Sequence, residues 1–237
     1  MHTTFHIASE RSRLYQLLAL AFAHPVEAFH RLLEDGSYGQ ALAATATAAS
    51  SRVTASLQVK QSFTEFEAGY ITLFQLGSRG KPLVSLNAGD YAALNDESSR
   101  PEFLLRYADW YRHFGLRADT GEDANELPDH LVCQLEFLAW LGHLEAGAAD
   151  KVDARRGYRR AQHDFLERHL EPFLSLLTES LLRLREDPVA AYYYALVADA
   201  ALISTETRRQ LATDIAADSP ANQLTDGDRI DAVNLWG

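Results

Sequence analysis

The chain has 237 residues, of which 47% are hydrophobic, and its 33 acidic residues against 22 lysines and arginines give a formal net charge of -11. This hydrophobic fraction is that of a folded globular protein rather than of a disordered acidic chain. The acidic balance argues against a nucleic-acid binder, which needs a basic face to neutralise phosphates. The single cysteine, Cys133, excludes an intrachain disulfide and suits a reducing compartment.

The first predicted element is a helix that ends before His24–Pro25. Its apolar run follows two arginines and so imitates a signal peptide. However, the apolar side chains recur at the spacing of a helix with one buried face, as shown by Leu14, Leu17, Leu18, Ala21 and Phe22. No stretch approaches the roughly 18 consecutive apolar residues of a membrane span. We therefore expect a cytoplasmic protein without a membrane-spanning segment.

A short second helix and a small-residue segment follow. Pro25 can open the helix, because a proline at the first helical position loses no hydrogen bond, and Gly36 and Gly39 are expected to end it. Residues 40–60 are rich in Ala, Ser and Thr. They predict either a helix with a thin buried stripe or a partly loose segment.

The middle of the chain alternates helices with two long polar loops. The segment Ser62–Glu65 has the sequence of a capping box and starts an aromatic-rich helix. The helical period then disappears over residues 77–100, which leave room for one short turn around residues 90–95. It returns over residues 101–114, and a second polar loop occupies residues 115–127.

Proline positions divide the C-terminal half into helices. Pro128–Asp129 should start a strongly apolar helix. Residues 152–185 should form two helices, because Pro172 cannot sit inside one without breaking it. Asp187–Pro188 opens another helix, and Ser204–Thr205 offers a cap for a last one that ends near residue 217.

No alternating pattern typical of a strand competes with these helices. The sequence therefore predicts an all-α protein of about ten helices, in which residues 1–217 form a single helical domain and residues 218–237 a loose polar tail. The long loops at residues 77–100 and 115–127 are candidate hinges. They leave open a monomer or a domain-swapped dimer.

Two short patterns suggest chemistry but lack the rest of their motif. Glu27 and His30 have the i, i+3 spacing of ligands in di-iron bundles, but such a site needs a second copy of the pair, which this chain lacks. Residues 77–81 contain Gly-Lys without the spacing or the preceding strand of a phosphate-binding loop. We therefore expect no catalytic residue, metal site or cofactor. A di-iron or haem-type enzyme using Glu27 and His30 stays as the alternative.

Three ionisable residues, Glu126, Asp129 and His130, gather at the junction of the second loop and the apolar helix. One interpretation is capping, in which Asp129 in the first turn favours the helix dipole and His130 satisfies a nearby backbone group. The other is a binding site for a positive charge. Because the reference pKa of histidine is about 6.5, His130 would then make binding pH-dependent near cytoplasmic pH.

The same segment carries a family resemblance. Residues 126–141, E-L-P-D-H-L-V-C-Q-L-E-F-L-A-W-L, resemble the central motif of the TorD/DmsD/NarJ family of cytoplasmic chaperones for molybdenum oxidoreductases. Residues 70–77 resemble the family's Y-x-x-L-F-x-x-G helix end, and residues 82–91 its proline-containing loop that closes on a tyrosine. Residues 169–173 resemble its H-L-x-P-W element. The motifs follow the family's order, and the resemblance spans about residues 10–215.

The sequence departs from the family pattern in two places. Ala88 and Gly89 stand where the family commonly has Glu and Ser, and Phe173 stands where it has tryptophan. The first departure removes polar side chains from the loop, whereas the second exchanges one aromatic ring for another. Together with Lys81–Pro82 and Ser85–Leu86, these features resemble the branch that serves periplasmic enzymes of the type II dimethyl-sulfoxide-reductase class.

The resemblance implies a chaperone without catalytic activity that holds the catalytic subunit of a molybdenum oxidoreductase until its cofactor is inserted. The expected partners are the apo catalytic subunit and its twin-arginine signal peptide, and no nucleic acid. Residues 86–150 contain thirteen acidic residues but only four arginines. Such an acidic surface suits an arginine pair followed by an apolar helix.

The implied client-binding site has an apolar floor and a polar end. Its residues are Tyr70, Leu73 and Phe74 as the floor, Tyr91 as a wall, Glu126, Asp129 and His130 as the polar end, and Pro82 and Pro128 beside them. Phe66 and Trp140 are assigned to the core, because they lie on the buried faces of their own helices. A helical adaptor unrelated to metalloenzymes is the remaining alternative.

Overall fold

The computed structural model describes residues 2–54, 57–77, 80–95, 98–116, 126–148 and 150–218. Within these ranges the chain is helical, with no strand and one isolated bridge, between Asn87 and His130. The all-α prediction is confirmed, with nine α-helices in the described ranges where about ten were expected.

The helices are α1 (His2–Phe22), α2 (Glu27–Glu34), α3 (Ser37–Ala48), α4 (Phe63–Phe74), α5 (Arg100–His113), α6 (Leu131–Gly147), α7 (Val152–Phe165), α8 (Glu171–Leu182) and α9 (Pro188–Ala217). A 3-10 turn, Ala88–Asp90, lies in the loop between α4 and α5, and a π-helical turn, Leu166–Leu170, joins α7 to α8.

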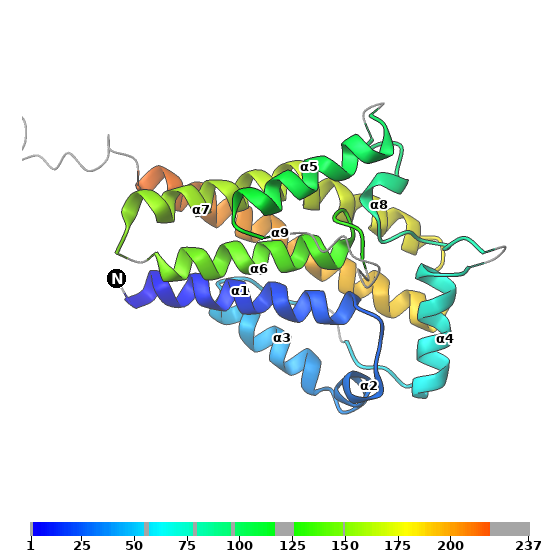
Figure 1. Ribbon diagram of the computed structural model, residues 1–237. Helices are drawn as coiled ribbons and strands as arrows, with labels where there is room; N and C mark the ends of the chain where they lie inside the picture. Colours follow the sequence, from blue (N-terminus) through cyan, green and yellow to red (C-terminus); the bar gives the residue numbers. More distant parts are fainter. Residues whose placement is uncertain are drawn as a thin grey trace, which may run out of the picture.

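The long helices form a bundle, with α1 lying along α6 and with α7 and α8 packed on α9 (Figure 1). Helix α4 stands across one end of this bundle, and α2 and α3 lie below it in the view of Figure 1. Each long helix contributes fully buried side chains to the core, among them Leu14 and Leu18 of α1, Leu135 and Leu138 of α6, Phe173 and Leu177 of α8, and Leu196 and Ile203 of α9.

Several start signals work as the sequence predicts. The Ser62 hydroxyl accepts a hydrogen bond from the backbone N–H of Glu65 at 3.4 Å, and the Glu65 carboxylate accepts from the backbone N–H of Ser62 at 2.9 Å. This confirms the capping box of α4. The Asp187 carboxylate likewise accepts from the first N–H groups of α9, which confirms that helix start.

The two glycines after α2 do not both end it. Helix α2 begins at Glu27 rather than at Pro25, and it ends at Glu34. Gly36 adopts φ +78° as the N-cap of α3, a conformation that glycine reaches without steric cost. Gly39 lies inside α3, so the predicted helix end at Gly39 is wrong. The small-residue segment then splits into α3 and a non-helical stretch before α4.

Residues 152–185 form two α-helices, α7 and α8, as Pro172 predicted. The π-helical turn before it widens the backbone spiral, and Pro172 occupies the first turn of α8, where its missing N–H is not needed. Ser204–Thr205 does not cap a separate helix, because α9 continues to Ala217. Ser204 is fully buried within it.

Parts of the predicted loops and tail lie outside the described residues. These are residues 55–56, 78–79, 96–97, 117–125, 149 and 219–237. The hinge assignments and the domain boundary at residue 217 therefore stay predictions. In the described part of the chain, no helix combines the length and apolarity needed to cross a membrane.

Candidate binding site at the loop-to-helix junction

The start of α6 is built onto the loop that follows α4. The backbone N–H of Leu131 donates to the carbonyl of Leu86 at 2.8 Å, and that of Ala88 donates to the carbonyl of Asp129 at 3.2 Å. The side-chain amide of Gln134 also donates to the Asp129 carbonyl, at 2.9 Å. These bonds bring the two segments that carry the predicted site together, although about forty residues separate them.

Asp129 fixes this arrangement rather than capping the helix. Its carboxylate is fully buried and accepts a hydrogen bond from the backbone N–H of Gly89 at 2.7 Å. The Arg100 guanidinium at the start of α5 lies 2.9 Å from the same carboxylate. Burial raises the pKa of Asp129, while the Gly89 N–H and Arg100 oppose that rise. Because α6 begins at Leu131, the predicted place of Asp129 in its first turn is wrong.

His130 is the N-cap of α6, as one of the two interpretations predicted. Its Nδ1 atom accepts from the backbone N–H of Val132 at 3.3 Å, so the proton of the neutral ring belongs on Nε2, which lies 3.3 Å from the Glu126 carboxylate. Burial lowers the pKa of His130 to about 4. The expectation that His130 titrates near cytoplasmic pH is therefore wrong, because desolvation disfavours the imidazolium.

Glu126 is the exposed member of the junction. Its side chain is 41% exposed, and partial burial raises its pKa. Burial, and then the charge of Glu126, raise the pKa of the Tyr70 phenol. Glu136, a further carboxylate on α6, also has a pKa raised by partial burial. These carboxylates can accept hydrogen bonds from a cationic ligand.

The predicted apolar floor is buried. Tyr70, Leu73 and Phe74 are 2%, 3% and 7% exposed. The Tyr70 hydroxyl donates to the carbonyl of Phe22 at 3.0 Å, and the Phe74 ring packs edge-on against Tyr193 of α9 at 4.8 Å between centroids. In this structure these side chains belong to the hydrophobic core, and their contact with a client stays a prediction.

The remaining predicted residues lie along the loop. Pro82 is half-buried, and the Tyr91 hydroxyl donates to the carbonyl of Ser85 at 2.9 Å. The Tyr91 ring packs against Phe173, with centroids 5.6 Å apart, so the aromatic residue that replaces the family's tryptophan supports the loop tyrosine. The carbonyl of Pro128 accepts from the Tyr111 hydroxyl at 2.6 Å.

Exposed leucines occur on the same segments. Leu76 follows α4, Leu83 lies in the loop and Leu127 precedes the start of α6, and they are 61%, 44% and 45% exposed. The backbone N–H of Val84 donates to the carbonyl of Leu73 at 2.9 Å, which holds this part of the loop against the end of α4. Apolar side chains in contact with solvent therefore accompany the carboxylates of the junction.

Sequence reasoning missed Gly89 and Arg100. A Cβ atom on Gly89 would lie 1.6 Å from a guanidinium nitrogen of Arg100, so the absence of a side chain there makes room for the cation that pairs with Asp129. The departure from the family pattern at Gly89 was the available signal. Nothing in the spacing pointed to Arg100, whose partner is 29 residues away.

The predicted core and metal residues have other contacts. Phe66 is fully buried, as predicted, whereas Trp140 is partly exposed and donates from its indole nitrogen to the carbonyl of Phe114 at 3.0 Å. Glu27 pairs with Arg31 at 2.8 Å, and His30 binds the carbonyl of Gln61 at 3.0 Å. These partners do not support the alternative in which Glu27 and His30 hold a metal.

Comparison with known proteins places the chain in a family. Residues 34–179 match the sequence model of a family described as nitrate reductase delta subunit. The chain belongs to this family.

Three relatives of this family member extend the match over most of its length. It is 39% identical over 227 residues to the dimethyl sulfide dehydrogenase assembly chaperone protein of Rhodovulum sulfidophilum, covering 94% of this chain and 91% of that protein. It is 35% identical over 175 residues to the perchlorate reductase assembly chaperone protein of Dechloromonas aromatica (strain RCB), covering 70% and 75%. It is 32% identical over 161 residues to the chlorate reductase assembly chaperone protein of Ideonella dechloratans, covering 68% and 70%. No solved structure matches the chain significantly.

Proposed function

We propose that this protein is a cytoplasmic assembly chaperone that binds the catalytic subunit of a molybdenum oxidoreductase and holds it for cofactor insertion before export. The observation that carries the proposal is the 39% identity to an assembly chaperone for dimethyl sulfide dehydrogenase along 94% of this chain. The client is an enzyme of the same class as those named in the relatives. The role is recognition without catalysis.

The junction supplies the chemistry for recognising an arginine-bearing leader. The Glu126 carboxylate is partly desolvated, and its nearest ionisable partner, His130, is held neutral by burial. A guanidinium placed there gains a charge-assisted hydrogen bond and offsets the cost of desolvating the carboxylate. The exposed leucines on the neighbouring segments suit the apolar helix that follows the arginines in such a leader.

The buried members of the predicted site act through position. Asp129 and His130 hold the loop and the helix start in register, and Tyr70, Leu73 and Phe74 are buried in the core. Pro82, Tyr91, Pro128 and Glu126 remain as the residues a client can reach directly. A variant at Glu126 therefore separates recognition from folding better than variants at Asp129 or His130.

The test of the site is titration of a synthetic twin-arginine leader peptide into the purified protein by calorimetry. We expect Glu126→Gln to weaken binding about tenfold, since it removes one charge-assisted contact. The matched control is Glu179→Gln on the exposed surface of α8, which should bind as the unmodified protein does. Equal affinity of all three proteins would rule out Glu126 as the leader site.

The chaperone role has a separate test. The catalytic subunit is co-expressed with and without this protein, and its molybdenum content is measured. A subunit that acquires its cofactor equally well in both cases would contradict the proposed function. Repeating the experiment with a leaderless subunit shows whether the chaperone also acts on the folded body.

A further inference from the structure

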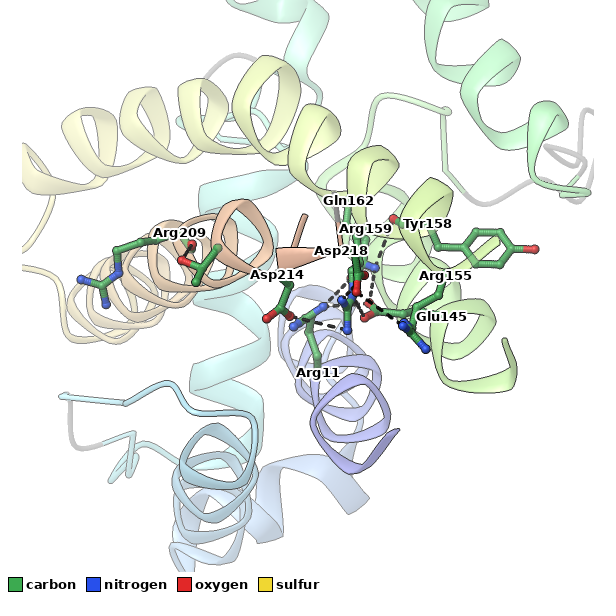
Figure 2. Close-up of polar contacts among 10 residues, drawn as sticks. Arg11, Glu145, Arg155, Tyr158, Arg159, Gln162, Arg209, Asp214 and Asp218 are labelled. Carbon is green, nitrogen blue, oxygen red and sulfur yellow. Dashed lines mark hydrogen bonds and ion pairs between the residues drawn. The ribbon is translucent and has the colours of Figure 1, made fainter. Parts of the chain in front are cut away.

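A buried network of charges lies at the other end of α6 (Figure 2). The carboxylate of Glu145, near the C-terminal end of α6, binds Arg11 of α1 at 2.9 Å and Arg159 of α7 at 2.7 Å. The side-chain amide of Gln162 donates to the same carboxylate at 2.8 Å. All four residues are at most 3% exposed. The network joins three helices. Arg11 is 134 residues from Glu145 in the sequence, whereas Arg159 lies on the next helix.

The same face of α7 binds the C-terminal end of α9. A second nitrogen of Arg159 lies 2.7 Å from the carboxylate of Asp218, the residue that follows α9, and Arg155 lies 3.5 Å from that carboxylate. Arg156 donates to the main-chain carbonyl of Asp218. One carboxylate and one carbonyl from the end of α9 thus occupy a site lined by three guanidinium groups. We call Arg155, Arg156 and Arg159 the α7 arginine site.

Some buried guanidinium nitrogens in this region lack an acceptor within the part of the chain that the structure describes. Among the described residues, the buried Nε atoms of Arg11 and Arg156 and one terminal nitrogen of Arg159 have no hydrogen-bond acceptor. That nitrogen of Arg159 lies 3.7 Å from the carboxylate of Asp214, which is close enough for an ion pair but too far for a hydrogen bond. Arg156 also faces Asp153 at 3.6 Å, but the Asp153 side chain is 99% exposed. Buried guanidinium groups are stable when their donors meet oxyanion acceptors, so a ligand that displaces Asp218 and brings more acceptor atoms would stabilise the site.

The α7 arginine site continues to the surface. Arg155 and Arg156 are partly exposed, and Lys151 and Arg160, before and beside them, are exposed. Arg155 also lies in the first turn of α7, where the free backbone N–H groups add positive potential. This cationic surface belongs to a protein with a net charge of -11, so its concentration on one helix needs an explanation other than overall composition.

We propose that the α7 arginine site docks a carboxylate-bearing segment of a partner protein, and that Asp218 occupies it when the partner is absent. Paired arginines recognise carboxylates through planar, bidentate hydrogen bonds. Asp218 acts as a competitor within the chain, which lowers the apparent affinity for the partner by the fraction of molecules in which the site is open. The inference goes beyond the proposed function, because it concerns the opposite end of α6 and an acidic rather than a basic ligand.

The test is fluorescence anisotropy of a labelled octaglutamate peptide titrated with the full-length protein at low ionic strength, where such contacts are least screened. Asp218→Asn keeps the size and main-chain carbonyl of the residue but removes the competing charge. We expect it to bind the peptide about tenfold more tightly than the unmodified protein. Equal affinity of the two proteins would overturn the proposal.

Substitutions at two pairs of arginines distinguish binding at the α7 arginine site from general electrostatic attraction of the acidic peptide. Adding Arg155→Gln and Arg156→Gln to Asp218→Asn should abolish the gain in affinity. Adding Arg183→Gln and Arg185→Gln, which are exposed after α8, changes the net charge equally and should preserve it. Equal losses from both pairs would also overturn the proposal. Circular dichroism checks the fold of each variant. If the protein with Arg155→Gln and Arg156→Gln does not fold, the milder Arg160→Gln takes the place of that pair. It should reduce the gain in affinity that Asp218→Asn gives.

Discussion

The guanidinium of Arg100 lies 2.9 Å from the buried carboxylate of Asp129, across 29 residues of sequence. This ion pair joins the start of α5 to the segment that begins α6, and the Gly89 N–H joins the preceding loop to the same carboxylate. A single side chain therefore holds three segments together. The junction is therefore a structural centre, and the proposed client-binding surface depends on it.

Replacing Asp129 by Ala should lower the free energy of unfolding by about 2–3 kcal/mol, because it leaves the Gly89 N–H and the Arg100 guanidinium without their acceptor. Urea denaturation followed by circular dichroism measures the change. Asp109→Ala removes an exposed ion pair with Arg112 and should cost no more than about 0.5 kcal/mol. A loss at Asp129 as small as at Asp109 would contradict the central role of its carboxylate.

Gly89→Ala should destabilise the protein by about 1–3 kcal/mol, because the new methyl group would displace the Arg100 guanidinium. Thermal unfolding of the pure variant measures this. The control is Gly157→Ala, at a helical position of α7 where an added Cβ meets open space. That change should stabilise the protein by about 0.5–1 kcal/mol. Stabilisation by both alanines would show that Arg100 adjusts without cost.

Stability should fall as the pH is lowered from about 6.5 to 4. Burial lowers the pKa of His130 and of His169 to about 4, so within this window the unfolded chain binds protons that the folded chain does not. Each histidine contributes a slope of up to about 1.4 kcal/mol per pH unit. Urea titrations at several pH values should show this slope decrease in His130→Asn, which retains a helix-capping side chain.

The control for this slope is the exposed His143 on α6. His143→Asn should leave the pH dependence as it is in the unmodified protein. If His130→Asn also leaves it unchanged, the imidazole of His130 is not the group that resists protonation.

Cys133 should react slowly with iodoacetamide in the folded protein. Burial, assisted by the charges of Glu136 and Glu126, raises the pKa of the thiol to about 12, and only the thiolate is nucleophilic. At neutral pH we expect alkylation about a hundredfold slower than for the urea-unfolded chain. Mass spectrometry of timed samples measures both rates, and comparable rates would mean that the thiol is not buried as described.

The sequence predicted helix starts well where the capping interactions join residues close in the chain. The capping box at Ser62 and the Asp187 N-cap involve residues a few positions apart, so they could be read from the sequence. Pro172 correctly marked the start of a second helix, but the π-helical turn before it was not predicted, because such a turn leaves no pattern of its own. Ser204 was misread because the same residue type serves as a cap or as a buried side chain, depending on tertiary packing.

The candidate site was predictable in its members but not in their roles. The spacing of Glu126, Asp129 and His130 marked the junction, and His130 as a cap followed from its position. That Asp129 would be buried against Gly89 and Arg100 depends on loop closure between distant segments, which sequence periodicity does not encode. The Arg11–Glu145 pair, separated by 134 residues, was missed for the same reason.

The bond between the Tyr111 hydroxyl and the Pro128 carbonyl has a consequence for engineering. Together with the bond from Trp140, in the middle of α6, to the Phe114 carbonyl, it holds the C-terminal end of α5 against α6 and the residues just before it. These contacts do not depend on the length of the chain between the two helices, and lengthening a flexible loop costs only about 0.6 kcal/mol for each doubling. A fluorescent reporter inserted between α5 and α6 should therefore leave both helix ends in place, and its signal would test the proposed arrival of a client at the junction.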